Sequence, residues 1–274
     1  MAPDLIPGAP AEVPEFLRAI DWDQPWLAPF RELGLSLQCA DWRRACTRQA
    51  AALDVRNHAG LPIRFVPQEQ LPPGVPYEAY IGATGQVPSR ENLHDFFNAL
   101  MWLALPQVKI GLNAIQASEI ARAAGEPAAP GGQRGRVRDA ATLFDESAAL
   151  VLVADPALES ALRAHQWDEL FQSRRASYGK QWQVIVFGHA LLEKLVSPYK
   201  AITAHAWVVE IHDQAALAQA DLNVTAAMVA EQLKQGLSKT RMSPLPLAGV
   251  PGWWPGQDQA FYADARVFRP RRAP

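Results

Sequence analysis

The clearest helix signal in this chain is the stretch from residue 90 to residue 105, which reads RENLHDFFNALMWLAL. Its apolar side chains recur at the spacing of one helix face. From Phe96 onward the stretch holds a single polar residue, Asn98. A helix this apolar needs protein on more than one side, so the pattern predicts a helix enclosed within the fold. We expect Ser89 to cap its start and Pro106 to end it.

Further helices and short strands are expected on both sides of this stretch. The other predicted helices cover residues 41–53, 107–124, 137–147, a segment that starts at 155, and 215–236. Short strands are expected at 62–67, 77–81 and 207–211, and residues 149–154 fit a buried strand or a helix extension. Residues 182–196 fit either one helix or a strand followed by a helix. The pattern as a whole predicts a mainly helical α+β fold.

One domain covering residues 1–274 is expected, because no repeat or linker composition interrupts the chain. The N-terminal segment, residues 1–34, carries aromatic side chains that predict docking onto the body. Residues 125–136 have the composition of an exposed loop. Residues 240–274 are rich in proline and glycine and are expected to form an irregular tail that is packed on the body.

The composition excludes several classes of protein. The chain has 274 residues, of which 49% are hydrophobic and 20% charged, so it is too apolar to be disordered. A formal net charge of −2 argues against a nucleic acid or an anionic membrane as its partner. Its longest clean apolar run, 148–154, is far shorter than the roughly 20 residues of a membrane-spanning helix. We therefore expect a soluble cytoplasmic protein, and its oligomeric state is left open.

Four predicted helices carry polar side chains at helical spacing on otherwise apolar surfaces. These are His94 and Asn98 with Asp95 beside them; Lys109, Asn113 and Gln116; Arg138, Thr142 and Asp145 with Asp139 and Glu146 beside them; and His189 and Glu193. A solvated face is usually rich in lysine and glutamate, whereas these residue types suit a buried network or a ligand site. The stripes predict one internal polar site where the helices meet. Glu146, near the end of its helix, is expected to face solvent.

The first interpretation of this site is a metal centre. Its predicted ligands are His94, Asp95, Asp139, His189 and Glu193. Imidazole and carboxylate groups together suit Zn²⁺, Mn²⁺ or Fe²⁺, each of which can activate water for hydrolysis. All of these ligands except Asp95 are also the predicted catalytic residues, and Arg138 would orient a small or phosphorylated substrate. The sequence has no HExxH motif of the kind that marks many metalloproteases.

The second interpretation is an anion or phosphate site at the loop 131–138, GGQRGRVR. Backbone donors at a helix start, together with the loop's arginines and Lys109, suit a phosphate. The loop does not follow the Walker pattern, so it predicts no nucleotide. The full set of predicted ligand-binding residues is Asn98, Lys109, Asn113, Arg134, Arg136, Arg138, Thr142 and Asp145.

The third interpretation assigns no chemistry to these side chains. In it, the pairs His94 with Asn98, Arg138 with Asp145 and His189 with Glu193 form a buried network. Such a network fixes how helices pack without binding a ligand. The residues alone leave all three interpretations open, and with them the question of whether the protein is an enzyme.

Four stretches of the sequence resemble one protein family. They are residues 87–100 (VPSRENLHDFFNAL), 138–146 (RDAATLFDE), 189–194 (HALLEK) and 251–253 (PGW). Together they are similar to the bacterial domain-of-unknown-function family 3025, over about residues 25–272. The resemblance implies a bacterial protein of this one family. It brings no known activity, so it implies no catalytic residue.

Overall fold

The computed structural model describes residues 12–125 and 133–271. The helices are α1 (Glu15–Arg18), α2 (Arg31–Leu37), α3 (Trp42–Ala52), α4 (Tyr77–Thr84), α5 (Leu93–Ala104), α6 (Pro106–Gly125), α7 (Gln133–Ser147), α8 (Pro156–Arg163), α9 (His189–Lys194), α10 (Gln214–Ala218), α11 (Leu222–Lys234) and α12 (Gln259–Tyr262). The strands are β1 (Arg64–Pro67), β2 (Gln86–Ser89), β3 (Ala148–Val153), β4 (Trp182–Val186), β5 (Thr203–Glu210) and β6 (Ser243–Pro246). The predicted class, mainly helical α+β, is confirmed.

A four-stranded sheet in the order β4-β3-β5-β6 forms the centre of the fold. β3 runs parallel to β5 and antiparallel to β4, and all of its residues are buried. Its sequence, AALVLV, is apolar throughout, as expected of a strand covered on both faces. β6 pairs antiparallel with β5 and places Pro244 opposite His205 and Pro246 opposite Thr203.

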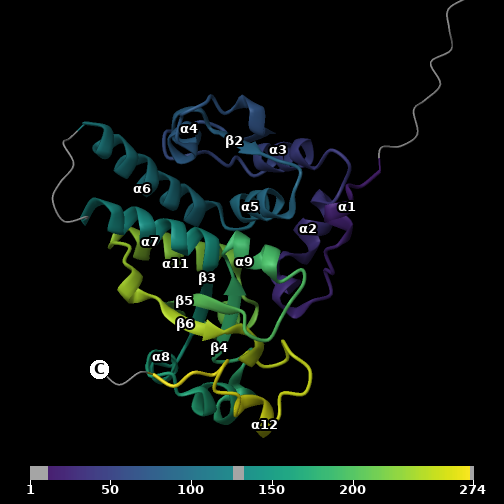
Figure 1. The fold of residues 1–274 in the computed structure, drawn as a ribbon, viewed down its shortest axis with the longest axis vertical. Helices are drawn as coiled ribbons and strands as arrows, with labels where there is room; N and C mark the ends of the chain where they lie inside the picture. Colours follow the sequence, from purple (N-terminus) through teal and green to yellow (C-terminus); the bar gives the residue numbers. More distant parts are fainter. Residues whose placement is uncertain (1–11, 126–132, 272–274) are drawn as a thin grey trace, which may run out of the picture.

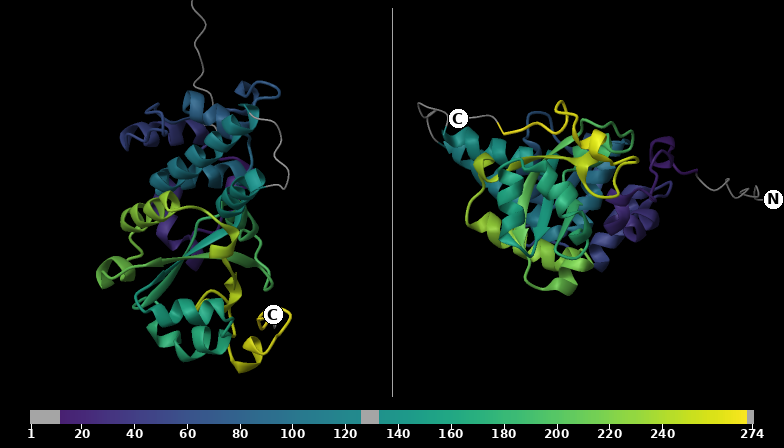
Figure 2. Two further views of the ribbon diagram at one scale, coloured as in Figure 1. Left: turned by 90° about the vertical axis from the view of Figure 1, so that its left-hand side faces the viewer. Right: turned by 90° about the horizontal axis from the view of Figure 1, so that it is seen from below.

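Helices lie on both sides of this sheet (Figures 1 and 2). α7 packs on β3 and β5, and α5, α6 and α9 join α7 in one helical layer. α8 and the C-terminal segment with α12 lie on the other side of the sheet. A two-stranded parallel sheet of β1 and β2 lies beyond α5, beside α3 and α4. The helical layer therefore contains all four of the helices for which polar stripes were predicted.

The enclosed helix predicted from the sequence is α5. Every residue from Asp95 to Ala104 is buried, which confirms that protein surrounds this helix. Its N-cap is Asn92, whose side-chain oxygen accepts a hydrogen bond from the backbone N–H of Asp95. The prediction that Ser89 caps the helix is wrong, because Ser89 is the last residue of β2.

Two other predicted elements are wrong. Residues 77–81, predicted as a strand, form the first turns of helix α4, which ends at Gly85 with a φ of 70°. The apolar alternation there is too short to specify a strand, and one side of the helix packs on α6. The single helix predicted at 215–236 is two helices, because Ala220 has a φ of 48° and Asp221 caps α11.

The remaining predicted elements agree with the structure within a few residues. Residues 182–196 form a strand followed by a helix, which settles the choice that the sequence left open. Residues 149–154 are strand β3 rather than a helix extension. α7 begins at Gln133, one turn before its predicted start, so only part of the predicted loop at 125–136 remains, and residues 126–132 lie outside the described residues.

Aromatic side chains near both ends of the described chain pack into the core. Trp22 and Trp26 near the N-terminus and Trp253 and Phe268 near the C-terminus belong to the hydrophobic core. The rings of Trp26 and Trp253 meet edge to face at 6.1 Å. The C-terminal tail is less irregular than expected, because it contains β6 and α12. Within the described ranges, none of the helices combines the length and apolar character needed to cross a bilayer.

Gly188 allows α9 to lie against the end of α7. A Cβ atom at this position would overlap the carbonyl oxygen of Glu146 and the backbone nitrogen of Ser147. Both are backbone atoms, so neither can move aside like a flexible side chain. Gly111, within α6, is different, because a Cβ there would lie 3.5 Å from a methyl carbon of Leu233, an ordinary contact.

We predict that Gly188→Ala lowers the free energy of unfolding by about 1–3 kcal/mol, because α7 and α9 must separate to admit the methyl group. Gly111→Ala is the matched control and should leave this free energy unchanged or raise it by up to about 1 kcal/mol, since it removes a glycine from a helix interior. Urea denaturation followed by circular dichroism measures both. Equal stability of the Gly188→Ala and wild-type proteins would contradict the close packing.

Candidate metal centre

The side chains of His94 and His189 meet between α5 and α9. Their Nε2 atoms lie 3.1 Å apart, and the two rings stand at 77° to each other. Two ligand atoms on one tetrahedral metal ion lie about 3.3 Å apart, given bonds of about 2.0 Å. The two imidazole nitrogens therefore already have a spacing that suits a shared metal ion.

Glu146, in the last turn of α7, is the third member of this group. Its Oε2 atom lies 3.4 Å from Nε2 of His189 and 4.0 Å from Nε2 of His94. All three ligand atoms lie within 4.8 Å of one another. Burial raises the pKa of the Glu146 carboxyl, while the nearby His94 opposes that effect. Two imidazoles and one carboxylate thus converge on one point from three helices.

Glu193 orients His94 from the opposite side of the ring. Its Oε2 atom lies 3.1 Å from Nδ1 of His94. A carboxylate on one ring nitrogen of a histidine fixes the ring and leaves the other nitrogen free to bind a metal. The sequence predicted Glu193 as a ligand, but its position is that of a supporting partner one turn after His189 on α9.

His189 is buried, with 4% of its surface exposed. Burial lowers the pKa of its imidazole to about 4, so the ring is neutral at pH 7. A neutral imidazole is the form that binds metals. Among the described residues, its Nδ1 atom has no hydrogen-bond partner, and a carboxylate oxygen of Asp145 lies 3.9 Å away. Its other ring nitrogen, Nε2, is the one that faces His94 and Glu146.

A buried ion pair lies next to His189. The Lys109 ammonium, on α6, lies 2.6 Å and 2.8 Å from the two carboxylate oxygens of Asp145 on α7. Burial opposes ionisation of Asp145, but the charge and hydrogen bonds of Lys109 hold the pKa of its carboxyl below the usual value. Lys109 is thus neutralised by Asp145.

Two buried asparagines link the helical layer to α4. The amide nitrogen of Asn113 donates to the carboxylate of Glu78 at 2.7 Å, and that of Asn98 donates to the hydroxyl of Tyr77 at 3.0 Å. Burial raises the pKa of both Glu78 and Tyr77. The side-chain oxygens of Asn98 and Asn113 have no partner within the described part of the chain. Sequence reasoning missed Tyr77 and Glu78, because it predicted their helix as a strand.

A pocket of about 320 Å³ opens beside the three converging ligands. Its lining includes four carboxylate side chains and one arginine. These are Glu78, Asp95, Asp145, Glu146 and Arg90. Arg90 is bound to Asp95 by two hydrogen bonds of 2.9 Å and 3.1 Å, so its charge is already matched. Asp145 is likewise matched by Lys109, so Glu78 and Glu146 are the lining carboxyl groups without a lysine or arginine partner among the described residues.

Two predicted metal ligands are not part of the converging group. Asp139 lies two turns before Glu146 on α7, about 10 Å along the helix axis. Its exposed carboxylate is 3.6 Å from the ammonium of Lys239. Asp95 lines the pocket but pairs with Arg90. Glu146 is partly exposed, with 35% of its side chain accessible, while its carboxylate lies beside the two imidazoles. Its seven-residue spacing from Asp139 was the signal that placed both on one helix face.

The described residues do not assemble the predicted anion loop. Residues 131–132 and the side chain of Arg134 lie outside the described part of the chain. Arg136 and Arg138 are exposed in the first turns of α7, whereas Lys109 is buried against Asp145. Thr142 donates a long hydrogen bond to the amide oxygen of Gln116, at 3.5 Å.

We predict that Lys109→Met lowers the free energy of unfolding by about 3–5 kcal/mol, because it leaves the buried Asp145 carboxylate without its partner. The double variant Lys109→Met/Asp145→Leu removes both charges and should recover most of that loss. Urea denaturation of the two variants and the wild type measures the difference. A cost below about 1 kcal/mol for Lys109→Met would contradict a buried, desolvated pair.

A family model described as "Protein of unknown function (DUF3025)" matches residues 63–272 of the chain. This range includes His94, Glu146 and His189, the pocket beside them and the whole four-stranded sheet. No curated protein and no solved structure matches the sequence. The match covers most of the chain and confirms the resemblance carried by the four short motifs, so the chain belongs to the DUF3025 family.

Proposed function

We propose that this protein binds one divalent metal ion through His94, His189 and Glu146 and uses it to hydrolyse a small molecule. The observation that carries the proposal is the convergence of three ligand atoms within 4.8 Å, each from a different helix. Two histidines and one carboxylate are the ligands of many catalytic zinc sites, which keep a further position for water or substrate. The same set also suits Mn²⁺ and Fe²⁺.

The surroundings of the ligands support a catalytic role over a purely structural one. The pocket of about 320 Å³ beside them gives a substrate access to the metal. A divalent ion held by His94, His189 and Glu146 would lower the pKa of a bound water to about 7 and so would supply a nucleophile. Glu193 holds His94 in orientation, and the Tyr77 hydroxyl, kept protonated by burial, can donate a hydrogen bond to the substrate.

The volume and charge of the pocket limit the substrate. A volume of about 320 Å³ is at the small end of ligand pockets. Its lining carries more carboxylates than cations, and its arginine, Arg90, is already paired with Asp95. The described lining therefore holds no unpaired cation that could bind a phosphate group. The proposed substrate is a small neutral or cationic ester or amide, and the phosphorylated substrate considered from the sequence is not favoured.

The main alternative is that the polar side chains only fix helix packing. A structural network would give each buried imidazole nitrogen a hydrogen-bond partner. A hydrogen bond between the Nε2 atoms of His94 and His189, at 3.1 Å, fits either interpretation. The position of Glu146 favours metal binding, because its Oε2 atom lies within 4.0 Å of both Nε2 atoms and so adds an anionic ligand at the same point.

Metal binding is predicted to occur with a stoichiometry near one ion per chain. Zn²⁺, Mn²⁺ or Fe²⁺, the last without oxygen, should bind the metal-free protein, as measured by calorimetry and elemental analysis. At one hundred times its Kd, the metal should raise the free energy of unfolding by about 2.7 kcal/mol. His189→Gln should fold but lose binding, whereas Glu193→Gln should weaken affinity about 10–100-fold.

His212→Ala is the matched control for metal binding, because His212 is exposed and lies outside the converging group. Its affinity for metal should equal that of the wild type. Two results would contradict the proposal: a stoichiometry near zero for all three metals, or a His189→Gln protein that binds metal as tightly as the wild type.

Hydrolysis is predicted for the metal-loaded protein with small chromogenic esters and amides, such as nitrophenyl acetate and an amino-acid nitroanilide. Chelation and Glu146→Gln should each reduce the rate at least about tenfold, because both remove the metal ion that activates water. Nitrophenyl phosphate should react no faster than it does without protein. Activity that survives chelation and persists in His189→Gln would refute the assigned site, and hydrolysis of the phosphate ester would overturn the substrate assignment.

A further inference from the structure

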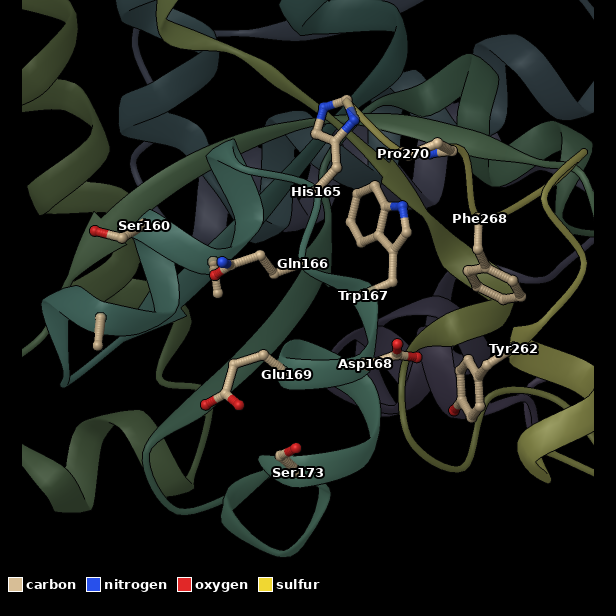
Figure 3. A pocket seen from close by; sticks show the side chains of 12 residues that line it. Ser160, His165, Gln166, Trp167, Asp168, Glu169, Ser173, Tyr262, Phe268 and Pro270 are labelled. Atoms are coloured by element: carbon tan, nitrogen blue, oxygen red, sulfur yellow. The ribbon is translucent and has the colours of Figure 1, made fainter. Parts of the chain in front are cut away.

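A second region with the features of a ligand site lies around His165, beyond the sheet from the metal centre (Figure 1). Two pockets of about 860 Å³ and 600 Å³ meet there. His165, Trp167 and Pro270 line both pockets, so these side chains form the partition between them. The larger pocket is drawn in Figure 3.

His165 occupies a backbone position that normally requires glycine. Its φ is 55°, in the left-handed region. It follows the last turn of α8, where its N–H donates to the carbonyl of Leu162 and the N–H of Gln166 donates to the carbonyl of Ala161. This pair of bonds marks the helix ending in which glycine usually takes the left-handed position. Asp54 and Ala220 also have a positive φ, but His165 differs from them because its side chain lies in the wall shared by two pockets.

The imidazole of His165 belongs to a rigid aromatic stack. It lies 5.0 Å from Trp167 at an interplanar angle of 24°, and Trp167 lies 5.7 Å from Phe171 at 9°. The indole N–H of Trp167 donates to the carbonyl of Arg269 at 2.7 Å, which fixes the C-terminal tail beside the stack. Nδ1 of His165 has no partner in the described chain. Figure 3 shows His165 next to Trp167, with Pro270 beside them.

The two pockets differ in charge. The smaller one is lined by three arginines, Arg266, Arg269 and Arg271, and its described lining includes no acidic side chain. Its other walls are mainly proline and aliphatic side chains. The larger pocket carries Asp168 and Glu169 instead. The His165 ring is therefore next to an apolar pocket with a cationic rim.

We propose that the smaller pocket binds a planar aromatic ring that bears a phosphate or carboxylate group. The ring packs against the imidazole of His165 and the apolar wall, and Arg269 and Arg271 hold the anionic group. Arginine binds both anions through paired hydrogen bonds. A volume of about 600 Å³ accommodates a molecule as large as a nucleoside monophosphate. This site is separate from the proposed metal centre and does not depend on it.

The ligand class is tested by calorimetry with probes that separate the ring from the charge. Adenosine monophosphate, uridine monophosphate and 4-hydroxybenzoate carry both features, adenosine carries only the ring, and ribose 5-phosphate carries only the charge. At least one of the first three should bind about tenfold or more tightly than either single-feature probe, and the binding should weaken with added salt. The nucleotide and benzoate results identify which anion is preferred. Equal affinity for ribose 5-phosphate, or binding of none of these probes, would overturn the proposal.

The role of His165 is tested by His165→Gly. Glycine relieves the backbone strain, so the Tm should be unchanged or higher by a few degrees, while the Kd for the best probe should weaken about tenfold or more. Arg271→Ala should weaken binding to a similar extent, and Arg48→Ala, at an exposed position elsewhere, is the matched control. Unchanged binding in His165→Gly would refute a ligand-binding role for the ring. Binding by the chelated wild-type protein should equal that of the untreated protein.

Discussion

The buried ion pair between Lys109 and Asp145 fixes how α6 and α7 sit against each other in the helical layer. Either charge alone would cost several kcal/mol in this buried position, so the two helices that carry them must keep one register. Asp145 is followed directly by Glu146, and fixing one carboxylate positions the other. The location of a proposed metal ligand thus follows from an interaction that itself binds no metal.

The sequence predicts an element well when its periodicity is long and strong. α5 is predictable because ten consecutive residues, Asp95 to Ala104, are buried, so its apolar pattern is dense. α4 is not, because a stretch of five residues fits a strand or a helix equally well, and its packing on α6 decides between them. The break between α10 and α11 combines a positive φ at Ala220, which its residue type does not predict, with the N-cap at Asp221, a local signal that the long helical pattern around it obscured.

The side chains of the candidate site could also be predicted only in part from the sequence. A helical spacing gives the direction in which a side chain points, and His94 and His189 were identified in this way. The spacing does not show which turn of the helix packs against the neighbouring helices. Asp139 and Glu146 share a face of α7, but only Glu146 is at the end that Gly188 and α9 approach. That choice depends on how distant parts of the chain pack.

The prolines of β6 affect whether separate copies of this chain can pair through their sheets. β6 is an outer strand of the sheet, and outer strands can recruit a strand from another molecule through their free backbone N–H groups. Pro244 and Pro246 have no N–H to offer. On the opposite edge, β4 is covered by α10 and the 3₁₀ helix at Pro25–Phe30. Both borders of the sheet are therefore closed to strand-by-strand polymerisation, which protects a chain with such an apolar centre from forming fibrils.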